Sequence, residues 1–228
     1  MASEVLVAEG IRKQYFRAGR QSGRTFDAVA PASLGLQAGE LVVCMGRSGS
    51  GKSTLLNMLA GLLAPTEGKV LLDGQDLYAL DDASLSRLRN QSIGVVPQGQ
   101  TALHSLTVLQ NVTLPSGLYG GGVDVEDRAL DLLGQMEIAD LADSYPAELS
   151  GGELRRMAIA RSMIMRPRVL FADEPTSDLD DETTRLVLGM LREVADGGQT
   201  VFVVTHEPEA KAYASRVLRM DAGKLEGC

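Results

Sequence analysis

One short stretch constrains this chain more than any other feature. Residues 46–53 read Gly-Arg-Ser-Gly-Ser-Gly-Lys-Ser and fit the pattern G-x-x-x-x-G-K-S/T at every fixed position. The apolar residues 41–45 before this stretch predict a buried parallel strand, and residues 54–63 after it predict a helix. A strand, a glycine-rich loop and a helix in this order are the setting in which the pattern binds a polyphosphate. The alternative is a plain Gly/Ser-rich turn, which the flanking strand and helix disfavour.

The residue types in this phosphate loop, residues 46–53, suit an anionic ligand. The glycines let backbone N–H groups turn inward around an anion, and the following helix directs its positive end at the same place. Lys52 adds a mobile cation, and Ser53 is placed to ligate Mg²⁺. The candidate nucleotide-binding residues here are Gly46, Arg47, Ser48, Gly49, Ser50, Gly51, Lys52, Ser53 and Thr54.

Length and charge narrow the class of protein. The 228 residues suffice for one domain with a core, and the formal net charge of −8 argues against nucleic acid as the main partner. Cys44 and Cys228 form no metal-type spacing, so a reducing compartment is favoured. The N-terminus lacks the apolar core of a signal peptide, and no apolar run is long enough to span a bilayer. We therefore expect any membrane role to use another chain.

Short apolar segments alternate with helical patterns along the chain. We expect strands at residues 5–8, 12–16, 32–36, 70–73, 93–97, 168–172, 200–204 and, as the last strand, 217–220, with a loop at 17–25. We expect helices at residues 82–90 with Asp81 as N-cap, and at 106–114, 125–133, 154–165, 181–195 and 209–215, with a flexible glycine break at 120–122. This order predicts an α/β fold with a mainly parallel sheet and binding groups beyond the carboxyl ends of its strands. Residues 1–98 and 167–228 are expected to form the core, and about 99–166 a helical insertion.

An acidic pair follows one of the expected strands. Asp173 and Glu174 come directly after the apolar residues 169–172. The aspartate can hold a metal ion through water, and the glutamate can orient and deprotonate an attacking water. One acidic pair also suits a turn or a helix cap. The phosphate loop in the same chain favours the hydrolytic interpretation.

Residues 149–153 read Leu-Ser-Gly-Gly-Glu and form a second motif, here called the signature segment. Ser150 and Glu153 fit the capping box of a helix start, which by itself needs no ligand. That interpretation leaves Gly151 and Gly152 unexplained, because glycines in a first turn cost helix stability. They make sense where the backbone must approach a ligand, and a capped helix N-terminus is an anion site. Two such sites in one chain suggest a nucleotide held between two subunits.

The order of these motifs resembles the nucleotide-binding subunit of ATP-binding-cassette (ABC) transporters, over essentially the whole chain. The resemblance rests on the phosphate loop, Gln98, the signature segment, residues 169–174, residues 177–180 (Ser-Asp-Leu-Asp) and His206. It implies a P-loop NTPase core with an antiparallel β subdomain and an α-helical insertion subdomain. It also implies that two subunits pair head to tail, with each ATP between one phosphate loop and the other subunit's signature segment.

The resemblance further implies roles for single residues. Gln98 senses the γ-phosphate and the metal ion and relays to a membrane partner. Asp180 belongs to a loop that crosses the dimer seam, and His206 contacts the γ-phosphate. Tyr15 stacks on adenine, and Phe16 is the alternative residue for this role. A purely structural interpretation is that the aromatic residue belongs to an edge strand and contacts no ligand. The implied catalytic residues are Glu174, His206 and Gln98, and the implied metal ligands are Ser53, Gln98 and Asp173.

Glu153 departs from the family pattern, which most often has glutamine there. Both residue types cap the helix, but a carboxylate near the partner's nucleotide would weaken nucleotide affinity. His104, the other histidine, matches no motif.

Residues 106–115 resemble the subfamily that includes macrolide exporters, lipoprotein-release systems, haem exporters and the cell-division cassette. This implies an ATP hydrolase with ATP and Mg²⁺, peripheral on the cytoplasmic face of the membrane. It would act as a homodimer that drives a separate permease, which selects the cargo. A cassette that regulates a membrane partner without transport is an open alternative. A soluble cassette on DNA or ribosomes is less favoured, because the chain is acidic and lacks coiled coils, zinc cysteines and a second cassette.

Overall fold

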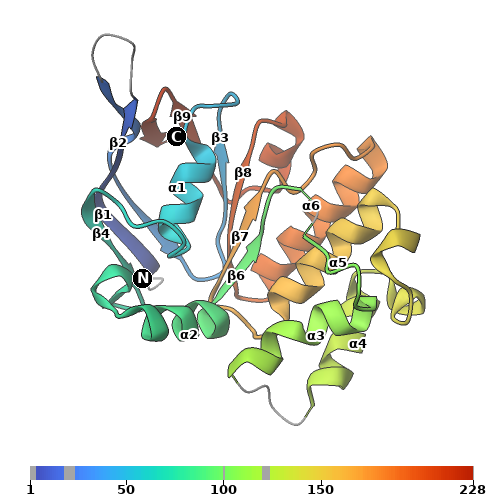
Figure 1. The fold of residues 1–228 in the computed structure, drawn as a ribbon. Helices are drawn as coiled ribbons and strands as arrows, with labels where there is room; N and C mark the ends of the chain where they lie inside the picture. Colours follow the sequence, from blue (N-terminus) through green and yellow to red (C-terminus); the bar gives the residue numbers. More distant parts are fainter. Residues whose placement is uncertain (1–3, 18–23, 100, 120–123, 228) are drawn as a thin grey trace.

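The computed structural model describes residues 4–17, 24–99, 101–119 and 124–227. Its strands form two sheets, and most of its helices lie to one side of the larger sheet (Figure 1). No helix in these ranges is long and apolar enough to cross a membrane.

The larger sheet has the strand order β10-β9-β3-β8-β7-β6. Its members are β3 (Leu41–Met45), β6 (Ile93–Val96), β7 (Val169–Asp173), β8 (Thr200–Thr205), β9 (Arg216–Asp221) and β10 (Lys224–Gly227). All neighbouring strands from β9 to β6 are parallel, whereas β10 is antiparallel to β9. The carboxyl ends of β3, β6, β7 and β8 therefore lie along one edge of the sheet.

Both faces of this sheet are covered, which explains why its central strands β3, β7 and β8 are mostly apolar and buried. Successive residues of β3 point to opposite faces. Leu41 and Val43 pack in one hydrophobic cluster with the helices α5 (Gly151–Met163) and α6 (Asp181–Asp196). Val42 and Cys44 pack in another cluster with α1 (Lys52–Leu59) and the smaller sheet.

The smaller sheet is antiparallel, with the strand order β2-β1-β4-β5. Its strands are β1 (Glu4–Arg17), β2 (Arg24–Gln37), β4 (Glu67–Leu72) and β5 (Gln75–Asp76). Buried residues such as Leu6, Ile11 and Leu36 attach this sheet to α1 and the larger sheet. The hairpin of β1 and β2 thereby reaches the edge where the phosphate loop lies (Figure 1).

The remaining helices are α2 (Asp82–Ser92), α3 (Val108–Tyr119) and α4 (Val125–Gln135), with short 3-10 turns at η1 (Leu77–Ala79), η2 (Ala139–Leu141), η3 (Pro146–Glu148) and η4 (Pro208–Tyr213). α3, α4 and α5 pack against one another beyond β6 (Figure 1). Aspartates cap two of the helices, at Asp81 as the sequence predicts and at Asp180, whose capping role was not predicted. The Asp81 carboxylate accepts a 2.9 Å hydrogen bond from the Ser84 N–H, and Asp180 does the same for Thr183.

The expected α/β class with a mainly parallel sheet is confirmed, and several element boundaries are corrected. Residues 5–8 and 12–16 are not two strands but parts of one, β1, in which irregular pairing near Gly10 lets the strand continue. The expected loop at residues 17–25 is shorter, since Arg17 ends β1 and Arg24 begins β2. Its middle, like the glycine break at 120–122, lies outside the described residues.

Four further corrections concern helices and the last strand. α3 does not stop at Leu114 but continues through Pro115, because Val108, Val112 and Ser116 bury one face of it. α5 begins at Gly151 rather than at residue 154, since its capping box lies before the glycines. The expected helix at residues 209–215 is replaced by the 3-10 turns of η4, Pro208–Tyr213, and β10 follows the strand that was expected to be last.

Candidate functional site

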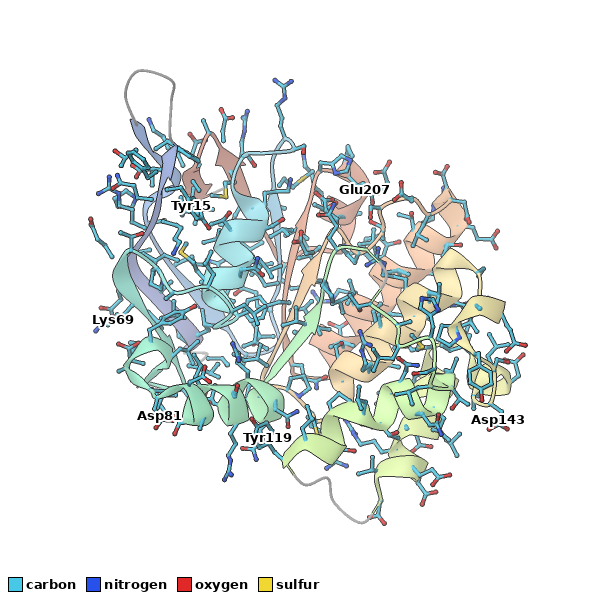
Figure 2. The ribbon with its side chains drawn as sticks, viewed as in Figure 1. Tyr15, Lys69, Asp81, Tyr119, Asp143 and Glu207 are labelled. Atoms are coloured by element: carbon cyan, nitrogen blue, oxygen red, sulfur yellow. The ribbon has the colours of Figure 1, made fainter. Side chains whose placement is uncertain are left out.

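The candidate site lies at the carboxyl edge of the larger sheet. The phosphate loop joins β3 to α1, and Gln98 follows β6. Asp173 ends β7 with Glu174 directly after it, and His206 follows β8. Because these strands are parallel neighbours, residues far apart in the sequence meet at one place. Glu207, labelled in Figure 2, marks the same end of the central strands.

The phosphate loop needs its glycines. Gly49 and Gly51 have φ of 77° and 106°, which are positions that favour glycine. A Cβ at Gly51 would collide with the Ala28 carbonyl oxygen, and one at Gly46 with the Met220 carbonyl oxygen. Ser50 Oγ is buried without a hydrogen-bond partner in the described part of the chain. The loop therefore forms a tight cradle with a buried hydroxyl group free to bond a ligand, which suits a phosphate site.

Lys52 lies inside this cradle rather than in solvent. Its side chain is 5% exposed, and Nζ donates a 2.8 Å hydrogen bond to the Gly46 carbonyl oxygen. Nζ also lies 3.2 Å from Oε1 of Glu174, whose side chain is 9% exposed. The cation and the acidic pair of the sequence analysis are thus direct neighbours.

Ser53 and Asp173 are the candidate metal ligands. Ser53 Oγ donates a 3.1 Å hydrogen bond to Asp173 Oδ1, across the gap between α1 and β7. Burial raises the pKa of Asp173, the Ser53 hydrogen bond opposes this effect, and the neighbouring Glu174 charge adds to it. A bound cation would favour the ionised form. Mg²⁺ commonly uses one or two protein oxygens together with substrate phosphates, so this donor pair fits it.

Glu174 is held by its neighbours. Its backbone has a φ of 46°, and its Oε2 accepts a 3.0 Å hydrogen bond from Thr205 Oγ1 and lies 2.9 Å from His206 Nδ1. Burial by itself would raise the pKa of Glu174. The hydrogen bonds from His206 and Thr205, followed by those of Lys52 and its charge, outweigh burial and leave the pKa below its usual value. The carboxylate is therefore ionised and fixed, as a base for water must be.

A cavity of about 460 Å³ opens over these groups. The residues that line it are Phe26, Asp27, Ala28, Ser48, Gly49, Gly51, Lys52, Ser53, Thr54, Gln98, Glu174, Ala222 and Gly223. The cavity thus brings the phosphate loop, Gln98 and Glu174 together. A second hollow of about 730 Å³ lies on the other side of the loop, beside Arg47 and His206.

The aromatic residues of the hairpin separate into two faces. Tyr15 pairs across the strands with Phe26, with ring centroids 6.1 Å apart, and Phe26 lines the cavity. Tyr15 lies on the β1–β2 hairpin at the end of the molecule that Glu207 also occupies (Figure 2). Phe16, the neighbouring residue in the strand, has the opposite side-chain direction and is 67% exposed. Of the two alternatives, Tyr15 is on the cavity's side.

The signature segment lies away from this cavity within one chain. Ser150 and Glu153 form the expected capping box, in which Glu153 Oε2 accepts a 2.7 Å hydrogen bond from the Ser150 N–H. Gly151 and Gly152 begin α5, and Asp180 caps α6. None of these residues lines the phosphate-loop cavity in the described structure. A single chain therefore supplies one half of the predicted two-sided nucleotide site.

Sequence reasoning missed several residues at or near the site, including the cavity-lining residues Asp27, Ala28, Ala222 and Gly223. Phe26 lines the cavity, but it lies in a stretch of β2 without a motif. Thr205 is fully buried and donates to Glu174, and its position at a strand end beside His206 was the available signal. Arg155 is buried in the signature helix and donates to Pro97, a contact that only the folded chain reveals.

Comparisons with known proteins identify the family. A model of the ABC transporter family matches residues 29–177. The chain belongs to this family. It is 39% identical to the lipoprotein-releasing system ATP-binding protein LolD of Aquifex aeolicus, over 99% of this chain and 97% of that protein. It is 41% identical to the methionine import ATP-binding protein MetN of Rhizobium meliloti, of which it spans 63%.

Solved structures agree with this assignment. The dimeric structure of the bacterial ABC transporter cassette MJ0796 has a TM-score of 0.88 and 34% identity, covering 97% of this chain and 96% of that one. A post-hydrolysis dimer of the same cassette, bound to ADP and Pi, has the same TM-score and identity. The resemblance and the P-loop NTPase fold are confirmed, and the chain is an ABC-type ATP hydrolase.

Proposed function

We propose that this chain is the ATP-hydrolysing subunit that drives a membrane complex, and that it uses Mg²⁺ as the metal ion. The observation that carries the proposal is the cavity in which Lys52, Ser53 and Glu174 converge with Gln98. The family assignment supports ATP as the nucleotide. Phosphates would lie on the backbone N–H groups of residues 46–54, with Lys52 as the mobile cation.

The residues that line the cavity, together with Asp173, Thr205 and His206 beside them, suit hydrolysis by an activated water. Ser53, Asp173 and Gln98 would hold Mg²⁺, which draws charge from the phosphates. Glu174 accepts the proton of the attacking water, since hydrogen bonds from Thr205 and His206 keep it ionised and oriented. His206 is 60% exposed at its side chain, so it can also turn toward the γ-phosphate.

We propose further that two copies pair head to tail and complete each site. The single chain leaves the signature segment off its own cavity, and the dimeric MJ0796 cassette is similar over nearly the whole chain. Ser150 and the N–H groups of Gly151 and Gly152 would face the nucleotide of the other copy. Asp180 would lie at the seam between the copies. Glu153 already accepts hydrogen bonds from Ser150 in its own helix, which limits the repulsion that its charge exerts on the nucleotide.

A membrane permease is the proposed partner, at the cytoplasmic face of the membrane. The relatives LolD and MetN are named for lipoprotein release and methionine import. The segment around α3 exposes large apolar side chains, which are Leu103, Leu114, Leu118 and Tyr119. It follows Gln98 in the sequence, so a partner seated there can sense the nucleotide site. Similarity to LolD over 97% of that protein favours the release-type subfamily, and a regulatory cassette remains the second candidate.

The dimer is tested with Glu174→Gln, which keeps the shape of the side chain but removes the base. Trapped ATP should hold two copies together, because a ligand that binds only the dimer shifts association by mass action. We expect a dimer with Mg-ATP and a monomer with ADP on size-exclusion chromatography. Adding Ser150→Arg should abolish that dimer while ATP binding at each phosphate loop persists.

Two results would overturn these proposals separately. A Glu174→Gln protein that binds ATP yet stays monomeric at high concentration, with its permease present, would exclude the two-sided site. Sedimentation with membranes that lack any partner protein would argue against the permease as the anchor. The expected result is sedimentation only when the permease is co-expressed.

A further inference from the structure

Arg155 is a buried cation in the signature helix α5. Arg155 is only 8% exposed, and it lies two positions after Glu153 in the sequence. Nη1 donates a 3.0 Å hydrogen bond to the Pro97 carbonyl oxygen. That carbonyl belongs to the peptide unit that joins Pro97 to Gln98. A residue of the signature helix therefore touches the backbone that presents Gln98.

Burial of such a cation destabilises the fold if the side chain contributes only packing. Burying an arginine without an ion pair costs free energy that an apolar side chain of similar length would avoid. Burial lowers the pKa of Arg155, and the charges of Asp178 and Asp173 oppose that effect. Neither aspartate forms an ion pair with Arg155 in the described part of the chain. The charges of Asp173 and Asp178 therefore act on Arg155 from two segments of the site, while its hydrogen bond goes to Pro97 in a third segment.

Around Arg155, helix α5 meets the segment after Gln98 and the loop that contains Asp178. A crevice of about 110 Å³ is lined by Gly99 and Thr101 after Gln98, by Gly151 and Arg155 of α5, and by Asp178. Asp178 has a φ of 65°, and it belongs to the segment that ends at the α6 cap Asp180. The crevice leaves room for small displacements between α5 and the segment that follows Gln98.

We propose that Arg155 is a positioning residue, which sets the place of Gln98 relative to the signature helix through the Pro97 carbonyl. The inference rests on the proposed role of Gln98 as a ligand of Mg²⁺. A residue that orients a metal ligand affects metal affinity and turnover without touching the metal. Movement of α5 would then be transmitted to Gln98, and movement of Gln98 to α5.

Arg161 provides a matched control on the same helix. Its Nη1 donates a 2.9 Å hydrogen bond to the Thr101 carbonyl oxygen, three residues beyond Gln98. Arg161→Met and Arg155→Met therefore each remove one arginine clamp between α5 and the segment after β6. Only Arg155 acts on the peptide unit next to Gln98.

The experiment measures ATPase rate against free Mg²⁺ for the full chain. Arg155→Met should raise the Mg²⁺ concentration for half-maximal rate about tenfold. Its affinity for ATP in EDTA and its thermal unfolding midpoint should stay near those of the wild type. Arg155→Lys, which can still donate to Pro97, should recover most of the effect, and Arg161→Met should leave the Mg²⁺ dependence unchanged. If Arg155→Met does not fold, Arg155→Gln replaces it.

A double-variant cycle separates this inference from the role of Gln98. Gln98→Ala should itself shift the Mg²⁺ dependence, and adding Arg155→Met should then change it little, because both act through one group. A shift in Gln98→Ala without one in Arg155→Met overturns the inference and leaves the proposed function. Wild-type Mg²⁺ dependence in Gln98→Ala overturns both the Gln98 role and the inference. Equal shifts in Arg155→Met and Arg161→Met would show general loosening of α5 and also overturn it.

Discussion

Nζ of Lys52 lies 3.2 Å from Oε1 of Glu174 at the floor of the phosphate-loop cavity. Both side chains are nearly buried, so each charge is compensated by the other more than by water. A nucleotide phosphate at the loop competes for the same ammonium group. We therefore expect ATP binding to separate the pair and to leave Glu174 free to face the attacking water.

Lys52→Ala should abolish ATP binding or nearly so. The variant removes the loop's buried cation and leaves Glu174 as an uncompensated negative charge beside the phosphates. We expect affinity to fall about 100-fold or more in equilibrium binding. Lys69→Ala is the control, because Lys69 is an exposed lysine that does not line the cavity. Near-wild-type affinity and turnover in Lys52→Ala would contradict the phosphate-loop assignment.

His206→Ala should separate binding from hydrolysis. Its Nδ1 contacts Glu174 Oε2, and its contact with the γ-phosphate is proposed to matter as charge develops during transfer. We expect kcat to fall about 100-fold while ATP affinity changes little. His104→Ala, an exposed histidine outside the site, should retain wild-type turnover. Affinity that falls in step with kcat, or unchanged kcat, would exclude the switch role.

The sequence predicted where the candidate site residues converge better than it predicted the boundaries of the helices and strands. The phosphate loop, Gln98, the acidic pair and His206 each follow a strand, and parallel strands bring their carboxyl ends together. The alternation of strands and helices in the sequence already predicts a parallel sheet, and the convergence follows from it. The capping box of Ser150 and Glu153 is local and was equally readable.

What the sequence could not supply depends on packing. α3 passes through Pro115 because its buried face outweighs the lost hydrogen bond, which no local propensity expresses. Arg155 looks like a surface residue in sequence, and only its burial against Pro97 singles it out. The partnership of Tyr15 with Phe26 needs the register of the β1–β2 hairpin.

The capping box of Ser150 and Glu153 should make a pH-dependent contribution to the free energy of unfolding. Hydrogen bonds from the Ser150 side chain and backbone hold the pKa of Glu153 below its usual value of 4.5. A depressed carboxyl pKa stabilises the fold above the unfolded value, and this stabilisation is lost as pH falls through the folded value. At pH 7, Glu153→Gln should therefore be less stable than the wild type in urea unfolding.

The difference between Glu153→Gln and the wild type should shrink as the pH is lowered below about 4.5, where the unfolded carboxyl becomes protonated. In a Ser150→Ala background, the same substitution should show a smaller pH dependence, because the hydroxyl hydrogen bond to Glu153 is gone while the backbone N–H of residue 150 can still donate. A stability difference that stays constant from pH 7 to pH 3 would contradict this account of the cap.

Tyr15→Ala and Phe26→Ala should each lower the affinity for ATP by removing a contact with its adenine base. The two rings pair across the hairpin, and Phe26 lines the cavity that begins at the phosphate loop. Stacking of a base on an aromatic side chain contributes about 1–3 kcal/mol, so each variant should lose roughly tenfold in ATP affinity. Phe16→Ala is the matched control and should bind ATP normally, because Phe16 points to the opposite face of the hairpin.

Inorganic triphosphate distinguishes a base contact from collapse of the hairpin. It binds the phosphate loop but has no adenine, so Tyr15→Ala and Phe26→Ala should bind it as the wild type does. Equal losses for ATP and triphosphate would show that the substitutions damage the loop through Ala28, whose carbonyl group lies against Gly51. A loss of ATP affinity in Phe16→Ala, with Tyr15→Ala unaffected, would assign the adenine to the other face of β1.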